Sequence, residues 1–407
     1  MKLLVVAHGA PSLGSGARVR NYHLLQALSQ AHDVSLLIVA DDAAEETQRA
    51  HPLREMVEAV YVTRALPGRF KRIYQLAALL FRRPSIMWRY SPPTAGVVIR
   101  RLLRQGQFDA VLFESVITAG HRLPPEVRVI VDEHNLEYEL LERSAEFIPS
   151  HSRKLHYQQE AAALRNVELN ILGRADLALV TSERERAFLS GALPGASVRV
   201  IPNGVDTRAY KPDERRMPVP GRIVFTGSMD YHPNEQAALY FAEQCWSRVR
   251  AQAPDATWTI VGRNPSPAVQ RLASLPGVTV TGTVPLTQPY LAEACVTIAP
   301  LLVGSGTRLK LLEALAMGNA VVSTSVGYEG LDLTPEVDLL VADDPAEFAA
   351  QVTRLLRDET LRAQLGAHGR ETVVRHYSWD HVGGLLLDTL SRLEMRERER
   401  HVVLADS

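Results

Sequence analysis

The sequence predicts an α/β fold of two successive doubly wound domains, each with a parallel sheet. Short apolar runs, typical of strands buried on both faces, alternate with stretches of helical periodicity. This alternation stops at a segment rich in proline and charge, residues 206–220, and then begins again. The length of 407 residues allows two or three domains, each with a core of its own. Two such domains that face a central cleft are the arrangement that this pattern favours.

The N-terminal half opens with a β-α-β unit. The continuous apolar run 3–7 predicts a buried strand, and a glycine-containing turn over 8–16 follows it. Apolar positions that recur every three residues predict a helix over 17–31. The same criteria predict a long helix over 150–172 and further strands over 34–39, 110–113, 127–131, 177–180 and 198–201.

The second half repeats this alternation. Its predicted strands are residues 222–226, 257–261, 278–281, 296–299 and 320–324, and its predicted helices are 234–251, 307–317 and 344–357. We therefore expect an N-terminal domain over 1–205, a linker over 206–220, a C-terminal domain over 221–377, a helix over 378–395 and a charged, frayed tail over 396–407.

The composition argues against several classes of protein. The 45 Lys and Arg residues against 46 Asp and Glu give a net charge of −1, whereas nucleic-acid-binding proteins usually carry a basic excess. Cys245 and Cys295 are too few for a disulfide framework and fit reduced thiols in the cytoplasm. No apolar stretch reaches the roughly 18 residues of a membrane span. The chain has neither a His-Glu-x-x-His nor an Asp-x-Asp motif, so we expect no metal ion and no cofactor.

The most informative segment is residues 300–318, where a predicted strand ends in a glycine-rich turn and a helix follows. The free N–H groups at a helix start bind anions, and glycines such as Gly306 let a phosphate approach the backbone. Arg308 and Lys310 add two cations in the first turn, where they oppose the helix dipole unless an anion is bound. We therefore predict a phosphate site at this turn.

Glu313 lies on the same helical face as Lys310, roughly 10 Å along the axis from Gly306. A carboxylate at this distance from a phosphate can accept hydrogen bonds from a ribose diol. The alternative is an ordinary amphipathic helix, on which Lys310 and Glu313 form a surface pair.

The run from Gly304 to Gly318 resembles the donor-site signature of family 4 glycosyltransferases, which are retaining enzymes of GT-B architecture. The resemblance extends from residues 200–206 and 225–229 to Tyr377-Ser378-Trp379, and so covers nearly the whole chain. It implies that the C-terminal domain binds a nucleotide-sugar donor and the N-terminal domain a saccharide or lipid-linked acceptor. It also implies that the helix over 378–395 crosses back to the N-terminal domain.

Within that family the chain is most similar to sugar transferases of bacterial exopolysaccharide assembly, on the basis of residues 132–138 and 227–234. Two positions depart from the family pattern. Ser305 stands where many members have the first of two glutamates, and the Gly-Arg…Lys pair that clamps the diphosphate is absent from 227–234. We expect Arg308 and Lys310 to take over the clamp. A nucleotide-sugar 2-epimerase of the same architecture, and a catalytically silent nucleotide-sugar-binding protein, are the alternatives.

The resemblance assigns roles to single residues. His134 matches a histidine that touches the transferred sugar, and Arg308 and Lys310 stabilise the departing diphosphate without a metal. The alternative for His134 is a structural or helix-capping role. The expected donor-binding residues are Gly16, Gly227, Ser228, Gly282, Thr283, Val284, Ser305, Gly306, Thr307, Arg308, Lys310 and Glu313. Polar residues at the ends of predicted strands are expected on the acceptor side, namely Glu114, Glu133 and Asn135.

A basic, aromatic-rich stretch occupies the middle of the N-terminal half. Between Ala59 and Phe108 there are ten Arg or Lys residues and no Asp or Glu. Such a segment is typical of a surface that lies on an anionic membrane or receives a polyanionic acceptor. The alternative is a solvated helical face whose charges pair with acids elsewhere. We expect peripheral contact with an anionic membrane through residues 64–104, at the inner face of the cell membrane, and no nucleic-acid partner.

Overall fold

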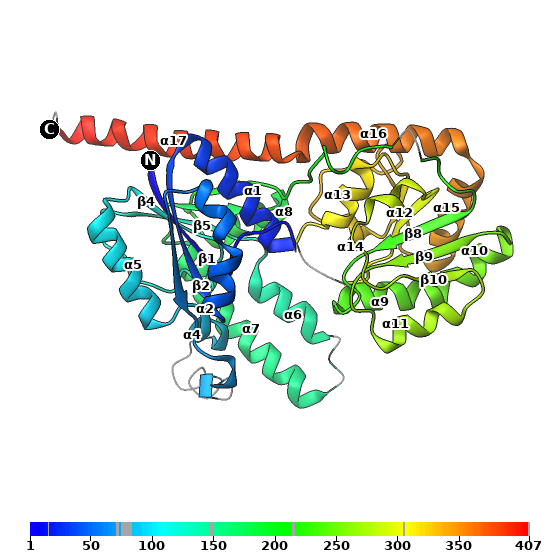
Figure 1. The fold of residues 1–407 in the computed structure, drawn as a ribbon, viewed down its shortest axis with the longest axis horizontal. Coiled ribbons are helices and arrows are strands. Elements are labelled where there is room, and N and C mark those ends of the chain that lie inside the picture. Colours follow the sequence, from blue (N-terminus) through cyan, green and yellow to red (C-terminus); the bar gives the residue numbers. More distant parts are fainter. Residues whose placement is uncertain are drawn as a thin grey trace. The chain divides into compact units, whose positions relative to one another are not determined.

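The computed structural model describes residues 1–14, 16–70, 73–74, 84–146, 148, 150–213, 216–303 and 306–405. The chain forms two compact units, the first made of residues 1–202 with the C-terminal segment from Val382, the second of residues 203–381. Each unit contains a parallel sheet (Figure 1). The predicted class of two doubly wound α/β domains is confirmed.

The first unit is built on a seven-stranded parallel sheet in the order β3-β2-β1-β4-β5-β6-β7. Its strands are β1 (Lys2–His8), β2 (Asp33–Ala40), β3 (Ala59–Arg64), β4 (Ala110–Phe113), β5 (Arg128–Asp132), β6 (Leu177–Val180) and β7 (Val198–Val200). Strand β1 pairs with β2 on one side and with β4 on the other, so the strand order reverses beside β1. A sheet of this type binds ligands outside the carboxyl ends of its strands at such a reversal.

The helices of this unit include every helix that the periodicity predicts there. They are α1 (Gly16–Ala31), α2 (Ala43–Arg49), α4 (Ser85–Tyr90), α5 (Pro93–Gly106), α6 (Glu137–Glu146), α7 (His151–Leu172), α8 (Glu183–Ala192) and the last helix, α17 (Trp379–Ala405). The described residues of this unit also form two short 3₁₀ turns, His51–Glu55 and Gly68–Phe70.

The second unit is built on a six-stranded parallel sheet in the order β10-β9-β8-β11-β12-β13. Its strands are β8 (Arg222–Thr226), β9 (Thr257–Val261), β10 (Val278–Val280), β11 (Val296–Ala299), β12 (Val321–Ser323) and β13 (Leu340–Val341). Its helices are α9 (His232–Tyr240), a π-helical turn (Phe241–Trp246), α10 (Ser247–Gln252), α11 (Pro267–Arg271), α12 (Gln288–Ala292), α13 (Leu309–Ala316), α14 (Ser325–Tyr328), α15 (Pro345–Arg357) and α16 (Glu359–Tyr377). The order reverses between β8 and β11, so the expected ligand edge includes the loops that follow these two strands.

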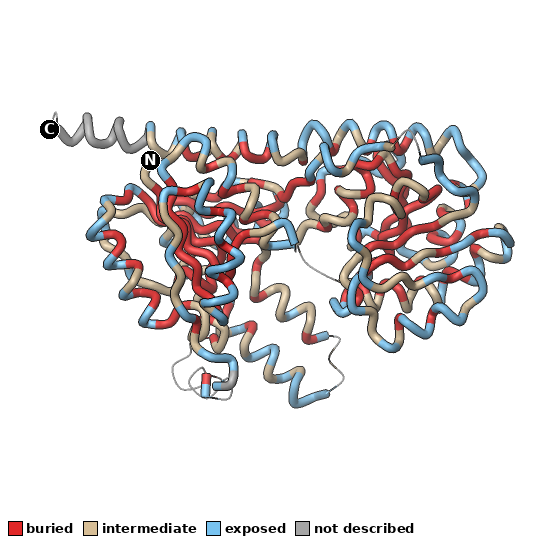
Figure 2. The backbone as a smooth tube through the Cα atoms, viewed as in Figure 1, coloured by how far each residue is buried: buried red, intermediate tan, exposed pale blue. Residues whose placement is uncertain are grey.

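Buried residues follow the strands in both units (Figure 2). In the second unit, Phe241 packs against Trp258 on β9 with ring centroids 4.8 Å apart, and against Phe348 on α15 at 5.9 Å. All three rings are fully buried. This aromatic core fixes β8 and β9 from one face, and thereby the loops at their carboxyl ends.

The last helix differs from its prediction at both ends. Helix α17 begins at Trp379 in the second unit and, from Val382 onward, belongs to the first unit. Leu386 and Leu390 are fully buried, and the N-terminal amino group lies 3.3 Å from Glu394. The helix continues to Ala405, where the sequence predicts a frayed tail.

Three further observations concern membrane spans, the cysteines and metal sites. Among the described residues, no helix combines the length and the apolarity that crossing a bilayer requires. Cys245 and Cys295 are both buried and carry free thiols. The part of the chain that the structure describes holds no group of three or more His, Cys, Asp or Glu side chains arranged for a metal ion.

Candidate active site

A first candidate site lies in the second unit, where β11 leads into α13. This helix begins at Leu309, two residues later than predicted, and Arg308 occupies its N-cap position. The Arg308 guanidinium is buried, and it donates to the carbonyl oxygens of Gly306 at 2.6 Å and Val326 at 3.4 Å. Arg308 therefore holds the glycine-rich loop against the start of α14, in addition to its positive charge at the edge of the sheet.

Lys310 reaches from the first turn of α13 toward the end of β8. Its ammonium donates a hydrogen bond to Oδ1 of Asn234 and lies 4.7 Å from the centroid of the buried Phe225 ring. Burial, and after it the positive charge of Arg308, lower the pKa of Lys310 to about 7. Among the described residues no carboxylate forms a salt bridge with this ammonium. An anion bound here would offset both the desolvation and the repulsion.

Two glycines bring the backbone close to this ammonium. A Cβ atom on Gly227 would lie 2.7 Å from Nδ2 of Asn234 and 3.0 Å from Nζ of Lys310. A Cβ atom on Gly262 would lie 1.6 Å from the Gly227 carbonyl oxygen. A side chain at position 227 would displace Asn234 and Lys310, whereas one at position 262 would clash with the backbone of Gly227. The ends of β8 and β9 can therefore approach this closely only because residue 262 is glycine. The predicted donor residues Gly227 and Lys310 thus come together.

Arg263 joins this loop although the sequence did not single it out. It follows β9 after Gly262, and its Nε donates to Oγ of Ser228 at 2.6 Å. Its carbonyl oxygen accepts the N–H of Met229 at 2.9 Å, and the side chain is exposed. The loop over 227–234 therefore has a guanidinium beside it, which comes from the next strand of the sheet rather than from the loop itself.

Glu313 lies one turn further along α13 and is not the surface residue of the alternative interpretation. Burial raises the pKa of Glu313 to about 7, against the opposing effects of a hydrogen bond from Tyr210 and the charge of Lys310. The Tyr210 hydroxyl lies 3.3 Å from Oγ1 of Thr287. Glu313 thus belongs to a partly buried polar group with Tyr210, Thr287 and Lys310.

The other predicted donor residues are spread over several loops. Gly282, Thr283 and Val284 follow β10, where Gly282 has a φ of 69° that favours glycine. Thr307 Oγ1 is buried and has no hydrogen-bond partner among the described residues. Gly16 begins α1 in the first unit, and Ser305 lies outside the described residues.

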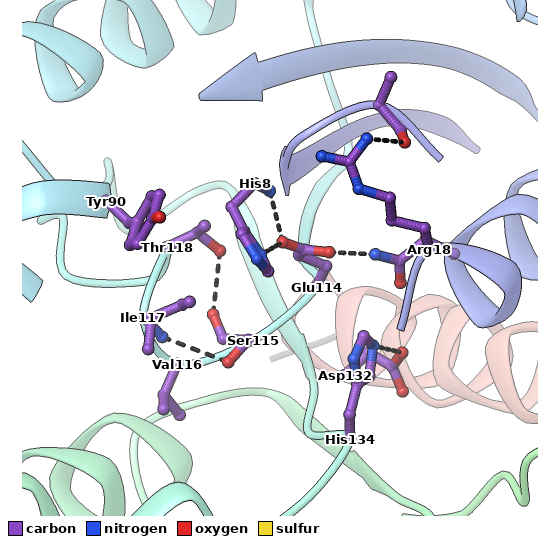
Figure 3. A network of polar contacts seen from close by, with 12 residues as sticks. His8, Arg18, Tyr90, Glu114, Ser115, Val116, Ile117, Thr118, Asp132 and His134 are labelled. Atoms are coloured by element: carbon purple, nitrogen blue, oxygen red, sulfur yellow. Dashed lines mark hydrogen bonds and ion pairs between the residues drawn. The ribbon is translucent and has the colours of Figure 1, made fainter. Parts of the chain in front are cut away.

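A separate candidate site lies in the first unit, at the carboxyl ends of β1, β4 and β5 (Figure 3). Glu114, directly after β4, accepts hydrogen bonds from the backbone N–H and from the ring Nδ1 of His8, and from the amide of Asn21. Burial would raise the pKa of Glu114, but the neighbouring His8 outweighs it and lowers this pKa. The negative charge of Glu114 in turn raises the pKa of His8.

His134 takes part in a buried ion-pair network. Its Nε2 lies 3.1 Å from Oδ2 of Asp132, and Asp132 forms a bidentate pair with Arg20 at 2.6 and 2.9 Å. Arg20 also donates to the carbonyl oxygen of Pro202 at 2.9 Å. The His134 side chain is only 10% exposed, and the contact of its Nε2 with Asp132 holds the ring in place.

Glu133 and Asn135 differ in exposure, although both are predicted on the acceptor side. Glu133 is buried, and its Oε2 accepts the N–H of Val116 at 3.3 Å. Burial and the nearby Glu168 raise the pKa of Glu133 well above its ordinary value. Glu168 accepts the N–H groups of Glu137 and Tyr138 at the start of α6. Glu133 thus lies beneath the surface, whereas Asn135 is half-buried.

The arginines of the predicted basic stretch differ in whether they form an ion pair or are exposed. Arg89 forms an ion pair with Asp41 at 2.7 Å, as the alternative interpretation expects. Arg64 on β3 and three arginines on α5 are exposed, the latter being Arg100, Arg101 and Arg104. Residues 71, 72 and 75–83 and the side chain of Arg69 lie outside what the structure describes.

Comparison with known proteins finds family models that match segments of both units. A family model described as Glycosyltransferase Family 4 matches residues 14–209, and one described as Glycosyl transferases group 1 matches residues 220–358. A phosphatidyl-myo-inositol mannosyltransferase of Mycolicibacterium smegmatis is 29% identical over 252 residues, which are 60% of this chain and 63% of that protein. An uncharacterized 44.6 kDa protein in the cps region of Klebsiella pneumoniae is 28% identical over 138 residues, 32% of this chain and 36% of that protein. The matched segments thus span less than two thirds of either relative.

Solved structures share the fold over nearly the whole chain. Sucrose-phosphate synthase of Thermosynechococcus elongatus has a TM-score of 0.71 at 18% identity and covers 98% of this chain and 100% of its own. Anabaena HepE in complex with UDP-glucose has a TM-score of 0.65 at 15% identity and covers 96% of this chain and 100% of its own. At these identities the likeness is one of fold.

Proposed function

We propose that this chain, a glycosyltransferase of GT-B type, moves a sugar from a nucleotide-sugar donor to a saccharide or lipid-linked acceptor with retention of anomeric configuration. The donor binds to the second unit, at the edge formed by the loops after β8, β9 and β11. The observation that carries this proposal is the ammonium of Lys310, which is desolvated, repelled by Arg308 and unpaired with any described carboxylate. A diphosphate is the kind of ligand that stabilises such a group.

The second unit supplies the charges that the departure of a nucleoside diphosphate requires. In the reaction, the bond between the anomeric carbon and the diphosphate oxygen breaks while the acceptor oxygen bonds to that carbon. The electron pair of the broken bond stays on the diphosphate, where Lys310 and Arg263 stabilise it and Arg308 holds the loop. Glu313 accepts hydrogen bonds from the ribose, and the loop over 282–284 holds the base. Because these side chains supply the positive charge, we expect transfer without a metal ion.

The comparisons support the donor class. The neighbour HepE binds UDP-glucose in the crystal, and the Mycolicibacterium relative is named a mannosyltransferase. A place in exopolysaccharide or related glycan assembly is suggested by the likeness of residues 132–138 and 227–234 to that group of transferases. Such a role would place the chain in the cytoplasm, at the inner face of the membrane.

The experiment that tests this function is transfer and binding by the wild type and by Lys310→Ala. Sugar transfer is measured with UDP-, GDP- and ADP-sugars and with octyl glycosides as acceptors, and UDP, GDP and ADP binding is measured by thermal shift. We expect transfer from at least one donor and loss of the shift in Lys310→Ala. Lys211→Ala is the matched control, because Lys211 is an exposed lysine of the same unit.

Other outcomes separate the alternatives. A 2-epimerase would convert the nucleotide sugar with no acceptor present. A silent binding protein would give a thermal shift but no turnover of any donor. The anomeric proton couplings of the product decide whether transfer proceeds with retention.

Contact with an anionic membrane through α5 is the remaining part of the proposal. Val97 is 59% exposed and lies on the same face of α5 as Arg100, Arg101 and Arg104, so this face combines an apolar side chain with three cations. Flotation with phosphatidylglycerol liposomes tests this contact. Binding that is lost in Arg100→Glu/Arg104→Glu, and at high salt, would support it, and no flotation of the wild type would exclude it.

A further inference from the structure

Tyr210 reaches the second-unit site from a segment that the sequence predicts to be a linker, residues 206–220. This segment belongs to the second unit. The Asp206 side chain accepts the N–H groups of Arg208 at 2.9 Å and Ala209 at 3.0 Å, and the Asp206 carbonyl oxygen accepts the N–H of Tyr210 at 2.8 Å. These bonds fix a turn that sets the position of the Tyr210 backbone.

The turn is held against helix α13. Arg370 on α16 donates hydrogen bonds to the carbonyl oxygens of both Tyr210 and Ala316, the last residue of α13. The Tyr210 ring packs against the buried cluster to which Leu312 of α13 belongs. A fixed backbone and a packed ring thus bring the Tyr210 hydroxyl to the helix that carries Glu313.

The Tyr210 hydroxyl forms two hydrogen bonds, one with the Glu313 carboxylate and one with Oγ1 of Thr287 at 3.3 Å. A phenol has a single proton, and an ionised carboxylate can only accept. Tyr210 therefore donates to Glu313 and accepts from Thr287. Thr287 occupies the N-cap position of α12 but makes no capping bond with its side chain, so its hydroxyl is available to Tyr210.

This bond affects both the charge and the orientation of Glu313. Burial raises the pKa of Glu313, and the hydrogen bond from Tyr210 opposes this rise, followed by the charge of Lys310. Burial and the charge of Glu313 raise the pKa of Tyr210, so the phenol keeps the proton that it donates. Glu313 is half-buried, and the phenol occupies one of about four acceptor positions on its carboxylate. The other positions are left for a ligand.

We infer that Tyr210 is a positioning residue for ribose recognition, which holds the Glu313 carboxylate in the orientation that accepts both hydroxyls of a vicinal diol. A carboxylate that is already oriented loses less conformational freedom when the diol binds. Tyr210 acts through Glu313 and does not itself touch the ribose. The site therefore favours nucleoside diphosphates with both the 2′- and the 3′-hydroxyl. The inference rests on the proposed function, in which Glu313 binds the ribose.

The test compares two kinds of ligand on the full chain. Calorimetric titration measures the Kd of UDP, GDP and ADP and of their 2′,3′-dideoxy forms. Tyr210→Phe keeps the ring and removes only the hydroxyl. We expect this variant to bind the ribonucleotide about 3- to 10-fold more weakly, less than the roughly 10- to 100-fold loss of a direct hydrogen bond to a charged group. Its affinity for the dideoxy form should stay at the wild-type value, whereas a merely structural defect would weaken both ligands alike.

Tyr240→Phe is the matched control. Tyr240 is a half-buried tyrosine of the same unit whose hydroxyl donates to the carbonyl oxygen of Asp343 at 3.4 Å. Both affinities should keep their wild-type values in this variant. Thr287→Val is a second test that leaves Tyr210 in place, and it should lower ribonucleotide affinity in the same selective way but by less.

Glu313→Ala shows whether Tyr210 acts through Glu313. This variant should lose the preference for the ribonucleotide, and Tyr210→Phe should then have no further effect, because the two residues act as a unit. Wild-type affinity for the ribonucleotide in Tyr210→Phe, an equal loss for both ligands, or a further loss in the Glu313→Ala background would overturn the inference. A wild type that binds none of the three diphosphates would instead overturn the proposed function.

Discussion

The ammonium of Lys310 lies 4.7 Å from the centroid of the Phe225 ring, near the end of β8, where Ile223, Val224 and Phe225 are fully buried. The electron-rich ring attracts a cation, but by less than the hydration that the cation gives up. The Asn234 amide oxygen adds a neutral partner. In the free protein, Phe225 and Asn234 thus stabilise the charge of Lys310 only in part. We therefore expect Lys310 to affect nucleotide affinity, proton binding and the stability of the protein.

Lys310→Met should weaken donor binding without destabilising the free protein. Methionine keeps the length of the side chain and its contact with Phe225, but it removes the desolvated charge. Loss of one hydrogen bond to a charged group costs about 1.5–3 kcal/mol, which weakens UDP binding roughly 10- to 100-fold. The unfolding temperature of the free protein should not fall. Calorimetric titration and thermal unfolding measure both effects, with Lys211→Met as control; unchanged UDP affinity would contradict the assignment.

Binding of a nucleoside diphosphate should take up a proton above neutral pH. With a pKa of about 7, Lys310 is mostly neutral at pH 8, and a bound diphosphate favours its charged form. Glu313, whose pKa is also about 7, becomes negative over the same range and repels the ligand. UDP affinity should therefore decrease as the pH rises from 7 to 9. Titrations in buffers of different ionisation enthalpy measure the uptake, which Lys310→Met should reduce to the part contributed by Glu313; binding without uptake in the wild type would refute the prediction.

Arg263→Gln should weaken binding less than Lys310→Met and in a more salt-dependent way. The Arg263 side chain is exposed, so water and salt screen its charge, unlike that of Lys310. We expect UDP affinity to fall about 3- to 10-fold at low ionic strength, and the difference from wild type to shrink in 0.5 M salt. Arg271→Gln, at the exposed end of α11, is the control. Equal affinities of wild type and Arg263→Gln at low salt would remove Arg263 from the site.

The strands that the sequence predicts are those with continuous apolar runs. Strand β1 is such a run, whereas β3 is an edge strand with half-exposed residues and was not predicted. An edge strand needs no apolar side chain on its open face, so its sequence resembles a loop. The helix predicted over 234–251 contains a π-helical turn that hydrophobic periodicity does not resolve.

The candidate site was predictable only where its residues are close in sequence or carry a family motif. The segment around Lys310 meets both conditions. Arg263 bonds to Ser228 across 35 residues, and His8 to Glu114 across 106. Such pairs depend on the strand order, which places β4 beside β1 and β9 beside β8. Neither the composition nor the spacing of residues along the chain indicates which residues form such pairs, although each of these residues lies at or near the end of a predicted strand.

Gly262→Ala should destabilise the second unit and abolish nucleotide binding. The added Cβ atom would lie 1.6 Å from the Gly227 carbonyl oxygen, so the ends of β8 and β9 must separate. We expect a loss of about 1–3 kcal/mol or more in unfolding free energy, as for an overpacked site. Gly191→Ala is the control, because nothing lies within 4 Å of a Cβ atom at that helical position. It should raise stability by about 0.5–1 kcal/mol. Thermal unfolding of both variants measures these changes in stability. An unfolding temperature for Gly262→Ala at or above that of wild type would contradict the close approach of residue 262 to the Gly227 carbonyl oxygen.

Arg20→Met should destabilise the first unit far more than a surface arginine substitution does. Arg20 and Asp132 are each 1% exposed, so the variant leaves a buried carboxylate whose remaining side-chain partner among the described residues is His134. Removal of one partner from a buried pair typically costs about 3–5 kcal/mol. Arg89→Met is the control, because its pair with Asp41 is 33% and 49% exposed and such pairs contribute about 0–1 kcal/mol.

The pH dependence of Arg20→Met gives a second, independent check. Burial would raise the pKa of Asp132, but Arg20 and His134 outweigh it and hold this pKa far below its ordinary value. The stabilisation is therefore complete above the unfolded pKa of about 4 and is lost as the pH falls through the native value. Hydrogen exchange of the β1 and β5 amides measures the stability of this unit at each pH. The difference between wild type and Arg20→Met should be large at pH 7 and should shrink in acid; a difference that does not change with pH would mean that packing, and not the charge of Asp132, makes Arg20 necessary.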